Sequence, residues 1–298
     1  MKLYTIRNSQ GNVKVVASTG TSGWADITDL YPTMIALIVS GARGMTEVTR
    51  RLHQKDKIFE WDDSWMIVAP IPEPVRNVYC VGWNYLKHFN EGVGKRGNQE
   101  ADLPEFPTFF TKSTRSVIGP RVEVPYDSEF TTKLDYEGEV AVIIGREGKN
   151  IGADEALSYV FGYSLANDVS ARDVQRRHGG QWLKGKSMDG SCPLGPAIVT
   201  ADEIPVLEDL TIRCVINGEV RQEARLNQLI FSIPRIIEEL SRGMTLVPGD
   251  IVLTGTPDGV GFAMNPPVFL NPGDHMTVES EQLGRLENVV GPDYHEMR

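Results

Sequence analysis

The stretch LDYEGEVAVIIGREGKNI, residues 134–151, decides the expected fold. Its centre is an apolar run, Val140 to Ile144, closed by Gly145, and this pattern is typical of a buried β-strand. Glu137 and Glu139 stand at the entrance of the strand. Residues two apart in a strand point to the same face, so the two carboxylates are aimed at one place and repel each other. Either a cation or a proton neutralises the pair, or one glutamate faces solvent at the strand end.

Length and composition indicate a globular protein of enzyme size. The chain has 298 residues, of which 41% are hydrophobic and 23% are charged, in one large domain or in a large and a small one. The net charge of −10 argues against nucleic acid as a partner, because phosphate binding needs a basic face. Apolar runs fall well short of the roughly 20 residues of a membrane span, so no membrane association is expected.

Three cysteines, Cys80, Cys192 and Cys214, indicate reduced thiols in a cytoplasmic protein, because the number is odd and no CxxC pair is present. Cys80 and Cys214 lie in apolar, strand-like runs and are expected in the core. Cys192 invites a thiol-enzyme hypothesis. Packing is the favoured interpretation, because no histidine lies near it in the sequence and Pro193 follows it.

Two domains are predicted, a small α+β unit over residues 1–70 and a larger domain over 71–298. The first sixteen residues alternate as strands do, without the pattern of a signal sequence. A hairpin is expected around residues 8–12, followed by helices over 30–39 and 47–58. The many glycines and prolines, 29 and 18, favour a β-rich fold.

In the larger domain, short helices are expected over residues 85–91 and 154–159. Ser170 and Asp173 match a capping box that starts a helix, and Asn217-Gly218 predicts a hairpin turn. Residues 227–242 have helical spacing, with Pro234 as a kink or as part of the first turn. The glycine-rich and polar segment 92–103 is predicted to form a mobile lid, and the segment from Trp182 to Pro196 to be irregular.

A third carboxylate for the glutamate pair is Asp168, which directly follows an expected strand. Glu137, Glu139 and Asp168 make an all-oxygen ligand set, which selects Mg²⁺ or Mn²⁺, with Ca²⁺ also possible, over zinc or copper. Three protein ligands leave positions for substrate or water. The alternative is that Asp168 is a carboxylate at a helix N-terminus with no metal. Asp135 alternates away from the glutamate face and is interpreted as a supporting group.

His88 and Glu91 are candidates for a general base and the carboxylate that orients it, because residues three apart in a helix share a face. A surface contact is the ordinary alternative for such a pair. Lys186, in a glycine-rich loop, is a candidate anchor for an anionic substrate or a proton donor, or else a solvated side chain. The hydroxyls of Thr254 and Thr256 and the backbone of the loop TGTPDGVG could hold a carboxylate.

Several common catalytic motifs are missing. The loop TGTPDGVG has no following GK[ST], so ATP binding is not indicated. No GxGxxG follows an expected strand, and no GxSxG is present, so neither a dinucleotide cofactor nor a serine hydrolase is supported.

Taken together and in order, eight segments resemble the fumarylacetoacetate hydrolase family over about residues 77–290. They are VGWNYLKHFNE, PTFFTKSTRSVIGP, LDYEGEVAVIIG, GYSLANDVSARDVQ, KGKSMDGSCPLGP, NGEVRQEA, LIFSIPRIIEELSRGMTLVPGDIVLTGTPDGVG and GRLENVV. The resemblance implies an α+β, mostly β fold, with a mixed β-roll or β-sandwich catalytic domain, usually in a homodimer, and a divalent cation.

The family's functional positions carry over to residues of this chain. The resemblance assigns the metal to Glu137, Glu139 and Asp168, and catalysis to His88, Glu91 and Lys186. Substrate binding is assigned to Tyr85, Gln175 and Thr256. One departure is Trp83, where many relatives have Arg or Leu. An aromatic residue at the pocket would change the preferred substrate shape.

The function predicted from this resemblance is metal-dependent hydrolysis of a carbon–carbon bond in a small β-diketo acid such as an acylpyruvate. His88 would activate water and Lys186 would help to stabilise the enolate. The alternative is a decarboxylase, isomerase or hydratase of 2-oxo acids in the same family, of the oxaloacetate decarboxylase or 2-hydroxyhepta-2,4-diene-1,7-dioate isomerase type. A non-catalytic protein that binds a small acid is a further class, although all the candidate site residues are present.

Overall fold

The computed structural model describes residues 1–18, 23–54, 58–95 and 102–295. Within these ranges the large sheet has twelve strands. Its main path runs in the order β4 (Ile58–Phe59), β3 (Trp24–Asp26), β2 (Val13–Ser18), β1 (Lys2–Asn8), β14 (Cys192–Thr200), β12 (Val160–Asn167), β11 (Gly138–Ile144), β17 (Ile251–Leu253), β6 (Val78–Gly82) and β7 (Thr108–Lys112). Two further strands pair with β1 and β14 respectively, β5 (Trp65–Ile67) and β8 (Val117–Ile118).

Smaller sheets and short helices complete the fold. A five-stranded sheet has the order β16 (Glu219–Arg225), β15 (Thr211–Ile216), β18 (His275–Ser280), β19 (Gly284–Asp293) and β9 (Glu123–Tyr126), and a two-stranded sheet joins β10 (Leu134–Asp135) and β13 (Ser170–Ala171). The α-helices are α1 (Met34–Leu52), α2 (Leu86–Glu91), α3 (Arg172–Gln175), α4 (Leu183–Lys186) and α5 (Ile233–Ser241). Single 3₁₀ turns are η2 (Thr114–Ser116), η3 (Ala156–Tyr159), η4 (Ala201–Glu203), η5 (Leu207–Asp209), η6 (Leu226–Gln228) and η7 (Gly261–Ala263).

Strand β11 is the centre of the packing, because both of its faces are buried. Val140, Val142 and Ile144 pack into a core shared with β15, β18 and β19 of the five-stranded sheet. Ala141 and Ile143 point the other way, into a core shared with β1, β2 and α1. The predicted buried strand is therefore confirmed, and so is the α+β, mostly β fold class with mixed sheets.

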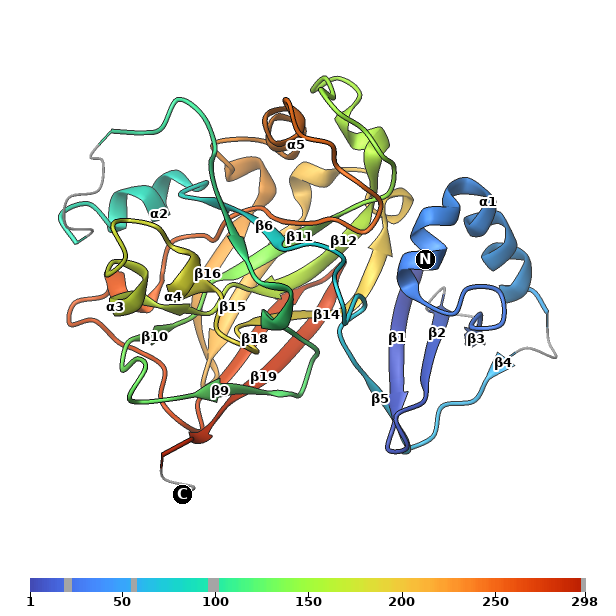
Figure 1. Cartoon of the computed structure of the whole chain (residues 1–298), viewed down its shortest axis with the longest axis horizontal. Helices are drawn as coiled ribbons and strands as arrows, with labels where there is room; N and C mark the ends of the chain where they lie inside the picture. The colour runs from blue at the N-terminus through green and yellow to red at the C-terminus, as the bar shows by residue number, and fades with distance from the viewer. Residues whose placement is uncertain (19–22, 55–57, 96–101, 296–298) are drawn as a thin grey trace.

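The N-terminal unit is joined to the rest of the molecule through the large sheet. Strand β1 pairs with β14, with Lys2 opposite Val199 and Leu3 opposite Ile198. Figure 1 shows this unit at one side of the molecule, while α2, α3 and α4 gather at the other. The division at residue 70 stays a prediction, but hydrogen bonds and a common core cross it.

Local predictions have mixed outcomes. The hairpins β1–β2 and β15–β16 form as expected, and Pro234 lies in the first turn of α5. The two helices expected over 30–39 and 47–58 are one helix, α1, which kinks at Gly41 with φ 57° and ends at Leu52. Residues 55–57 and, in the expected lid, 96–101 lie outside the described ranges.

Two expectations were wrong. Ser170 belongs to β13 and its hydroxyl donates to the Asp168 carbonyl, so the cap of α3 is Ala171 and no capping box forms. The segment expected to be irregular contains α4 and the first half of β14. At Ser170 and in β14, pairing with distant strands overrides local preference.

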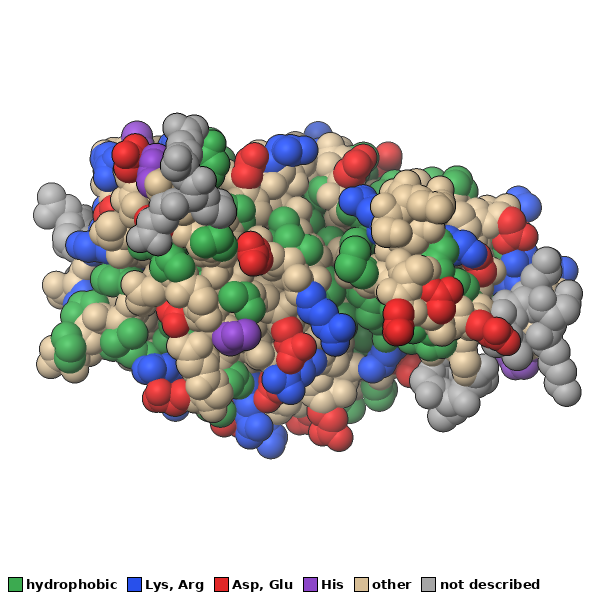
Figure 2. Space-filling view, turned by 90° about the horizontal axis from the view of Figure 1, so that it is seen from below, with side chains coloured by type: hydrophobic (Ala, Val, Ile, Leu, Met, Phe, Trp, Pro, Cys, Tyr) green, Lys and Arg blue, Asp and Glu red, His purple; other side chains and the backbone are tan. Residues whose placement is uncertain are grey.

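The surface has mixed charge. Figure 2 shows acidic and basic side chains interspersed over the face seen from below. No helix in the described ranges is long and apolar enough to cross a membrane.

The shared core predicts that the N-terminal unit and the strands beneath it unfold together. Leu37 on α1 is fully buried in this core, so Leu37→Ala should lower the free energy of unfolding by about 2–5 kcal/mol. Far-UV circular dichroism and tryptophan fluorescence should report one transition, shifted equally. Val39→Ala, at a position 63% exposed on the same helix, is the control. Two separate transitions, with only one of them shifted, would contradict a common core.

Candidate active site

Three carboxylates from neighbouring strand ends form the centre of the site. Glu137 and Glu139 lie at the start of β11, and Asp168 follows the end of β12. These strands are antiparallel, with Gly138 opposite Asn167, so the two ends coincide. Possible ligand atoms of Glu137, Glu139 and Asp168 lie within 4.8 Å of one another, and all three residues are buried.

Cationic side chains surround this cluster. The ammonium of Lys186 lies 2.5 Å from Glu137 Oε2 and 2.7 Å from Asp168 Oδ2. Lys112, which is fully buried at the end of β7, lies 2.8 Å from Asp168 Oδ1. Arg172 of α3 donates to Glu137 Oε1 over 2.6 Å. Since burying a lone charge is costly, these partners allow the carboxylates to exist inside the protein.

The carboxylates differ in their protonation behaviour. Burial raises the pKa of Glu139, and the negative charges of Asp168 and Glu137 raise it further. Burial also acts to raise the pKa of Glu137, but Arg172 and Lys186 outweigh it and hold that pKa below its usual range. Lys186 keeps its proton, because Asp168 and Glu137 outweigh the effect of burial and raise its pKa.

The cluster fits a divalent cation. Asp168 Oδ1 is buried and has no hydrogen-bond partner among the described atoms, although Lys112 lies beside it. Of the three carboxylates, Glu139 has the least neighbouring positive charge to offset its burial, and its pKa is raised for that reason. A hard cation among Glu137, Glu139 and Asp168 would satisfy both groups, and all-oxygen donors suit Mg²⁺, Mn²⁺ or Ca²⁺.

The predicted histidine–carboxylate pair is formed. Helix α2 places His88 Nδ1 2.7 Å from Glu91 Oε1, and His88 is buried. The other oxygen of Glu91 accepts from the backbone N–H of Gly259 over 2.8 Å. A carboxylate that accepts from Nδ1 leaves Nε2 of a neutral imidazole free of its proton and able to accept one.

The glycine-rich loop after β17 holds carboxylates of the protein itself. The Gly255 N–H donates to Glu139 Oε2 over 2.6 Å, as that of Gly259 does to Glu91. Both glycines have positive φ, and a side chain on either would collide with backbone or side-chain atoms. These two donors are therefore engaged, contrary to the expectation that this backbone holds a substrate carboxylate. Thr256 does line the cavity, and its hydroxyl donates to the Gly138 carbonyl.

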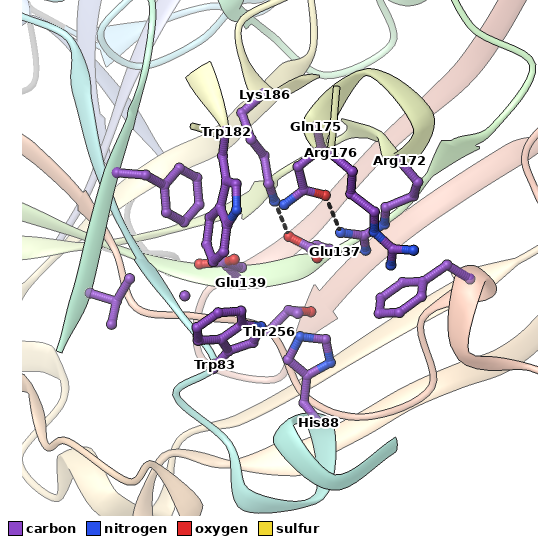
Figure 3. Close-up of a pocket in the computed structure, with 14 residues that line it drawn as sticks. Trp83, His88, Glu137, Glu139, Arg172, Gln175, Arg176, Trp182, Lys186 and Thr256 are labelled. Carbon is purple, nitrogen blue, oxygen red and sulfur yellow. Dashed lines mark hydrogen bonds and ion pairs between the residues drawn. The ribbon is translucent and has the colours of Figure 1, made fainter. Parts of the chain in front are cut away.

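A cavity of about 30 Å³ lies against the carboxylates. Figure 3 shows Trp83 and Trp182 on one side, Arg172 and Arg176 on the other, and His88 below. The full lining is Val81, Gly82, Trp83, His88, Phe110, Glu137, Glu139, Arg172, Gln175, Arg176, Trp182, Lys186, Thr256 and Phe262. Tyr85, assigned to substrate binding, is buried at the start of α2 and does not line this cavity.

The aromatic wall depends on an unusual backbone. Trp83 has φ 56°, in the left-handed region that a bulky residue rarely adopts. Its ring makes an edge contact with Trp182, at 4.9 Å between centroids. Trp83 thus borders the cavity.

Asp135 supports the site without joining it. It is fully buried, and its oxygens accept from Arg172 Nε over 2.8 Å and from the backbone N–H groups of Tyr136, Gly261 and Phe262. It fixes Arg172, which in turn contacts Glu137.

Cys192 does not suit the thiol-enzyme hypothesis. Its side chain is fully buried, and burial raises its pKa to about 12. A thiol that keeps its proton is a poor nucleophile.

Sequence reasoning missed Lys112, Arg172, Arg176 and Trp182. Lys112 could have been found, because it lies in the apolar strand TFFTK and a buried cation needs an anionic partner. For the other three, no pattern in the sequence separates them from surface residues.

Comparisons with known proteins show the family to which the chain belongs. The family model described as "Fumarylacetoacetate (FAA) hydrolase C-terminal" matches residues 77–291. Oxaloacetate tautomerase YisK of Bacillus subtilis is 47% identical over 223 residues, covering 75% of this chain and 72% of that protein.

Solved structures agree with this result. The fumarylacetoacetate hydrolase of Exiguobacterium antarcticum has a TM-score of 0.84 at 36% identity, over 98% of this chain and 99% of that one. A maleylpyruvate hydrolase of Sphingobium sp. SYK-6, solved with manganese and pyruvate, has a TM-score of 0.73 at 29% identity, over 98% of this chain and 100% of that one. The chain belongs to the fumarylacetoacetate hydrolase family and is an enzyme of that family.

The raised pKa of Glu139 predicts an effect on stability. The folded metal-free protein favours the protonated acid, so stability falls as pH rises above the usual carboxyl pKa of about 4.3. Glu139→Gln removes this penalty and should raise the melting temperature of the metal-free protein at pH 8, with less gain at pH 5. Mn²⁺ at about 100 times its dissociation constant should stabilise the wild type by about 2.7 kcal/mol and the variant much less.

Thermal unfolding in EDTA and in Mn²⁺ at both pH values measures this effect. Glu129→Gln, at a position 77% exposed, is the control and should behave as the wild type does. A Glu139→Gln protein that gains as much from Mn²⁺ as the wild type would remove Glu139 from the ligand set.

Proposed function

We propose that this protein is a divalent-cation-dependent tautomerase of small 2-oxo acids, which interconverts the keto and enol forms of a substrate such as oxaloacetate. The observation that carries the proposal is the shared cavity. The carboxylates of Glu137 and Glu139 and the imidazole of His88 line the same small space. This arrangement supports a cation site and a proton carrier that act on one substrate.

The cation is the cofactor of the proposed site. Glu137, Glu139 and Asp168 would hold it, and Mg²⁺ and Mn²⁺ are the proposed ions. When bound, the ion supplies a Lewis acid for the negative charge that develops on a 2-oxo group.

The chain itself supplies the general base. His88, oriented by Glu91, takes the proton from carbon 3 of the keto acid at Nε2, and the C–H electron pair forms the carbon–carbon double bond. Lys186 stays an ammonium beside the cluster and stabilises the negative charge on the 2-oxo oxygen with a hydrogen bond. That oxygen takes its proton from solvent, and His88 releases to solvent the proton that it took from carbon 3. The reverse reaction returns both protons. Gln175 and Thr256, which line the cavity, orient the substrate, whereas Tyr85 directly precedes α2 and does not line the cavity.

Tautomerisation needs only these groups, and several relatives support it by name. YisK and the human mitochondrial FAHD2B, 40% identical over 262 residues, are both described as oxaloacetate tautomerases. This reading is closer to the isomerase alternative than to the carbon–carbon hydrolase expected first.

Hydrolysis of a β-diketo acid is the second candidate function. A specific observation favours it, because His88 paired with Glu91 is also suited to activating water. One of the similar structures is described as a maleylpyruvate hydrolase, which also supports this candidate.

Removing the imidazole should abolish the proton transfer. For His88→Gln, we expect kcat for oxaloacetate tautomerisation to fall about 10²–10⁴-fold, because general-base catalysis contributes that factor. The loss of enol absorbance in Mn²⁺ measures the rate, with the uncatalysed rate subtracted. His275→Gln, an exposed histidine on β18, is the control. Full activity of His88→Gln, or of wild type in EDTA, would refute the proposal.

The same preparation separates the two candidate functions. Acetylpyruvate cleavage, followed by release of acetate and pyruvate, should be at least about 100-fold slower in kcat/KM than oxaloacetate tautomerisation, since specificity of this size follows from a few kcal/mol of transition-state binding. The opposite ratio would make the protein a hydrolase.

A further inference from the structure

The cavity has two walls of different chemistry. One is aromatic and consists of Trp83, Phe110 and Trp182, whose rings contact one another edge to face. The other carries the guanidinium groups of Arg172 and Arg176, as Figure 3 shows. The part of a substrate that extends beyond the carboxylate cluster meets one of these walls.

The first of the two arginines is fully occupied. Arg172 is buried and donates to Asp135 and Glu137, and also to Gln175 Oε1 over 3.2 Å. Each of these acceptors belongs to the protein. Arg172 therefore holds the site together and has little capacity left for a ligand.

The second arginine, Arg176, has no such partner among the residues that the structure describes. In the part of the chain that the structure describes, no carboxylate pairs with Arg176. Its guanidinium carbon lies 5.2 Å from the centroid of the Phe262 ring. Arg172 lies over the same ring at 4.5 Å. The neighbouring acidic residue, Asp173, lies nearest to Arg177, at 3.9 Å, and accepts from Thr131.

The surroundings of Arg176 favour an anion. Partial burial lowers its pKa, and the positive charge of Arg172 lowers it further. Asp135 and Glu137 both accept from Arg172, and among the described residues no carboxylate pairs with Arg176 beside it. The cavity wall therefore carries a surplus of positive charge. Arg176 is exposed at this wall, and a carboxylate placed there would be bound by a guanidinium that also lies over the Phe262 ring.

We propose that Arg176 is the specificity residue of the site and binds the distal carboxylate of a 2-oxo dicarboxylic acid. This inference rests on the proposed function, and it narrows the substrate class from 2-oxo acids to short dicarboxylates. The 2-oxo end lies at Glu137, Glu139 and Asp168, and the second carboxylate lies at the arginine wall. Arg176 touches the substrate but moves no proton.

The test compares two substrates that differ in one charge. Oxaloacetate carries the distal carboxylate, and its 4-methyl ester has nearly the same shape without that charge. For Arg176→Gln, KM for oxaloacetate should rise roughly 10- to 50-fold, as expected for loss of a charged hydrogen bond at a partly exposed site. kcat should change less than about 3-fold, and KM for the ester should stay within about 2-fold of wild type. Arg176→Lys should recover part of the loss.

Arg177→Gln is the matched control, because this adjacent arginine is exposed, as Arg176 is, but does not line the cavity. It should leave both KM values unchanged. Equal effects of Arg176→Gln on oxaloacetate and on the ester, or no effect on either, would overturn the assignment. Melting temperatures of all variants separate a specific loss of affinity from unfolding.

Binding of unreactive acids distinguishes this inference from the proposed function. Malate and lactate differ by the distal carboxylate and do not enolise. The Mn²⁺-loaded wild type should be stabilised by malate at lower concentration than by lactate, and Arg176→Gln should remove the difference. A wild type without tautomerase activity that keeps this preference would refute the function and support the subsite. An active wild type that shows no preference would refute the subsite alone.

Discussion

Three carboxylates share one buried space where the start of β11 meets the end of β12, and the rest of the site follows from that constraint. Glu137, Glu139 and Asp168 lie too close together to be ionised without compensation. Lys112 and Lys186 approach Asp168 from two sides, and Arg172 covers Glu137. The cations come from β7, α3 and α4, so the cluster ties these elements to β11 and β12.

Much of this arrangement could be predicted because its signals are local. The apolar run of β11 and the two-residue spacing of Glu137 and Glu139 require only the geometry of a strand. The spacing of His88 and Glu91 requires only one turn of helix, which α2 provides. Asp168 could be found because strand ends are where side chains reach a cavity.

The remaining contacts could not be predicted, because they join positions far apart in the chain. Gly255 reaches Glu139 across 116 residues, and Gly259 reaches Glu91 across 168. From the sequence, the glycine-rich loop was expected to bind a substrate anion through its backbone N–H groups. The sequence does not show that Glu139 and Glu91 of the protein accept from two of these groups. The capping pattern at Ser170 failed for a related reason, since pairing of β13 with β10 decides the local structure. The ordered motifs shared with the family assigned roles to His88, Glu91 and Lys186 that residue spacing alone left open.

The pairing of β1 with β14 has a consequence for how this chain can be divided. Strand β14 lies between β1 and β12, so its backbone donors and acceptors are satisfied on both sides. A fragment that starts at the predicted boundary near residue 71 would leave β14 as an open edge strand beside an uncovered apolar face. Open edges of this kind are templates for pairing with other chains. The N-terminal residues thus cover a strand edge that could otherwise pair with other chains and lead to aggregation.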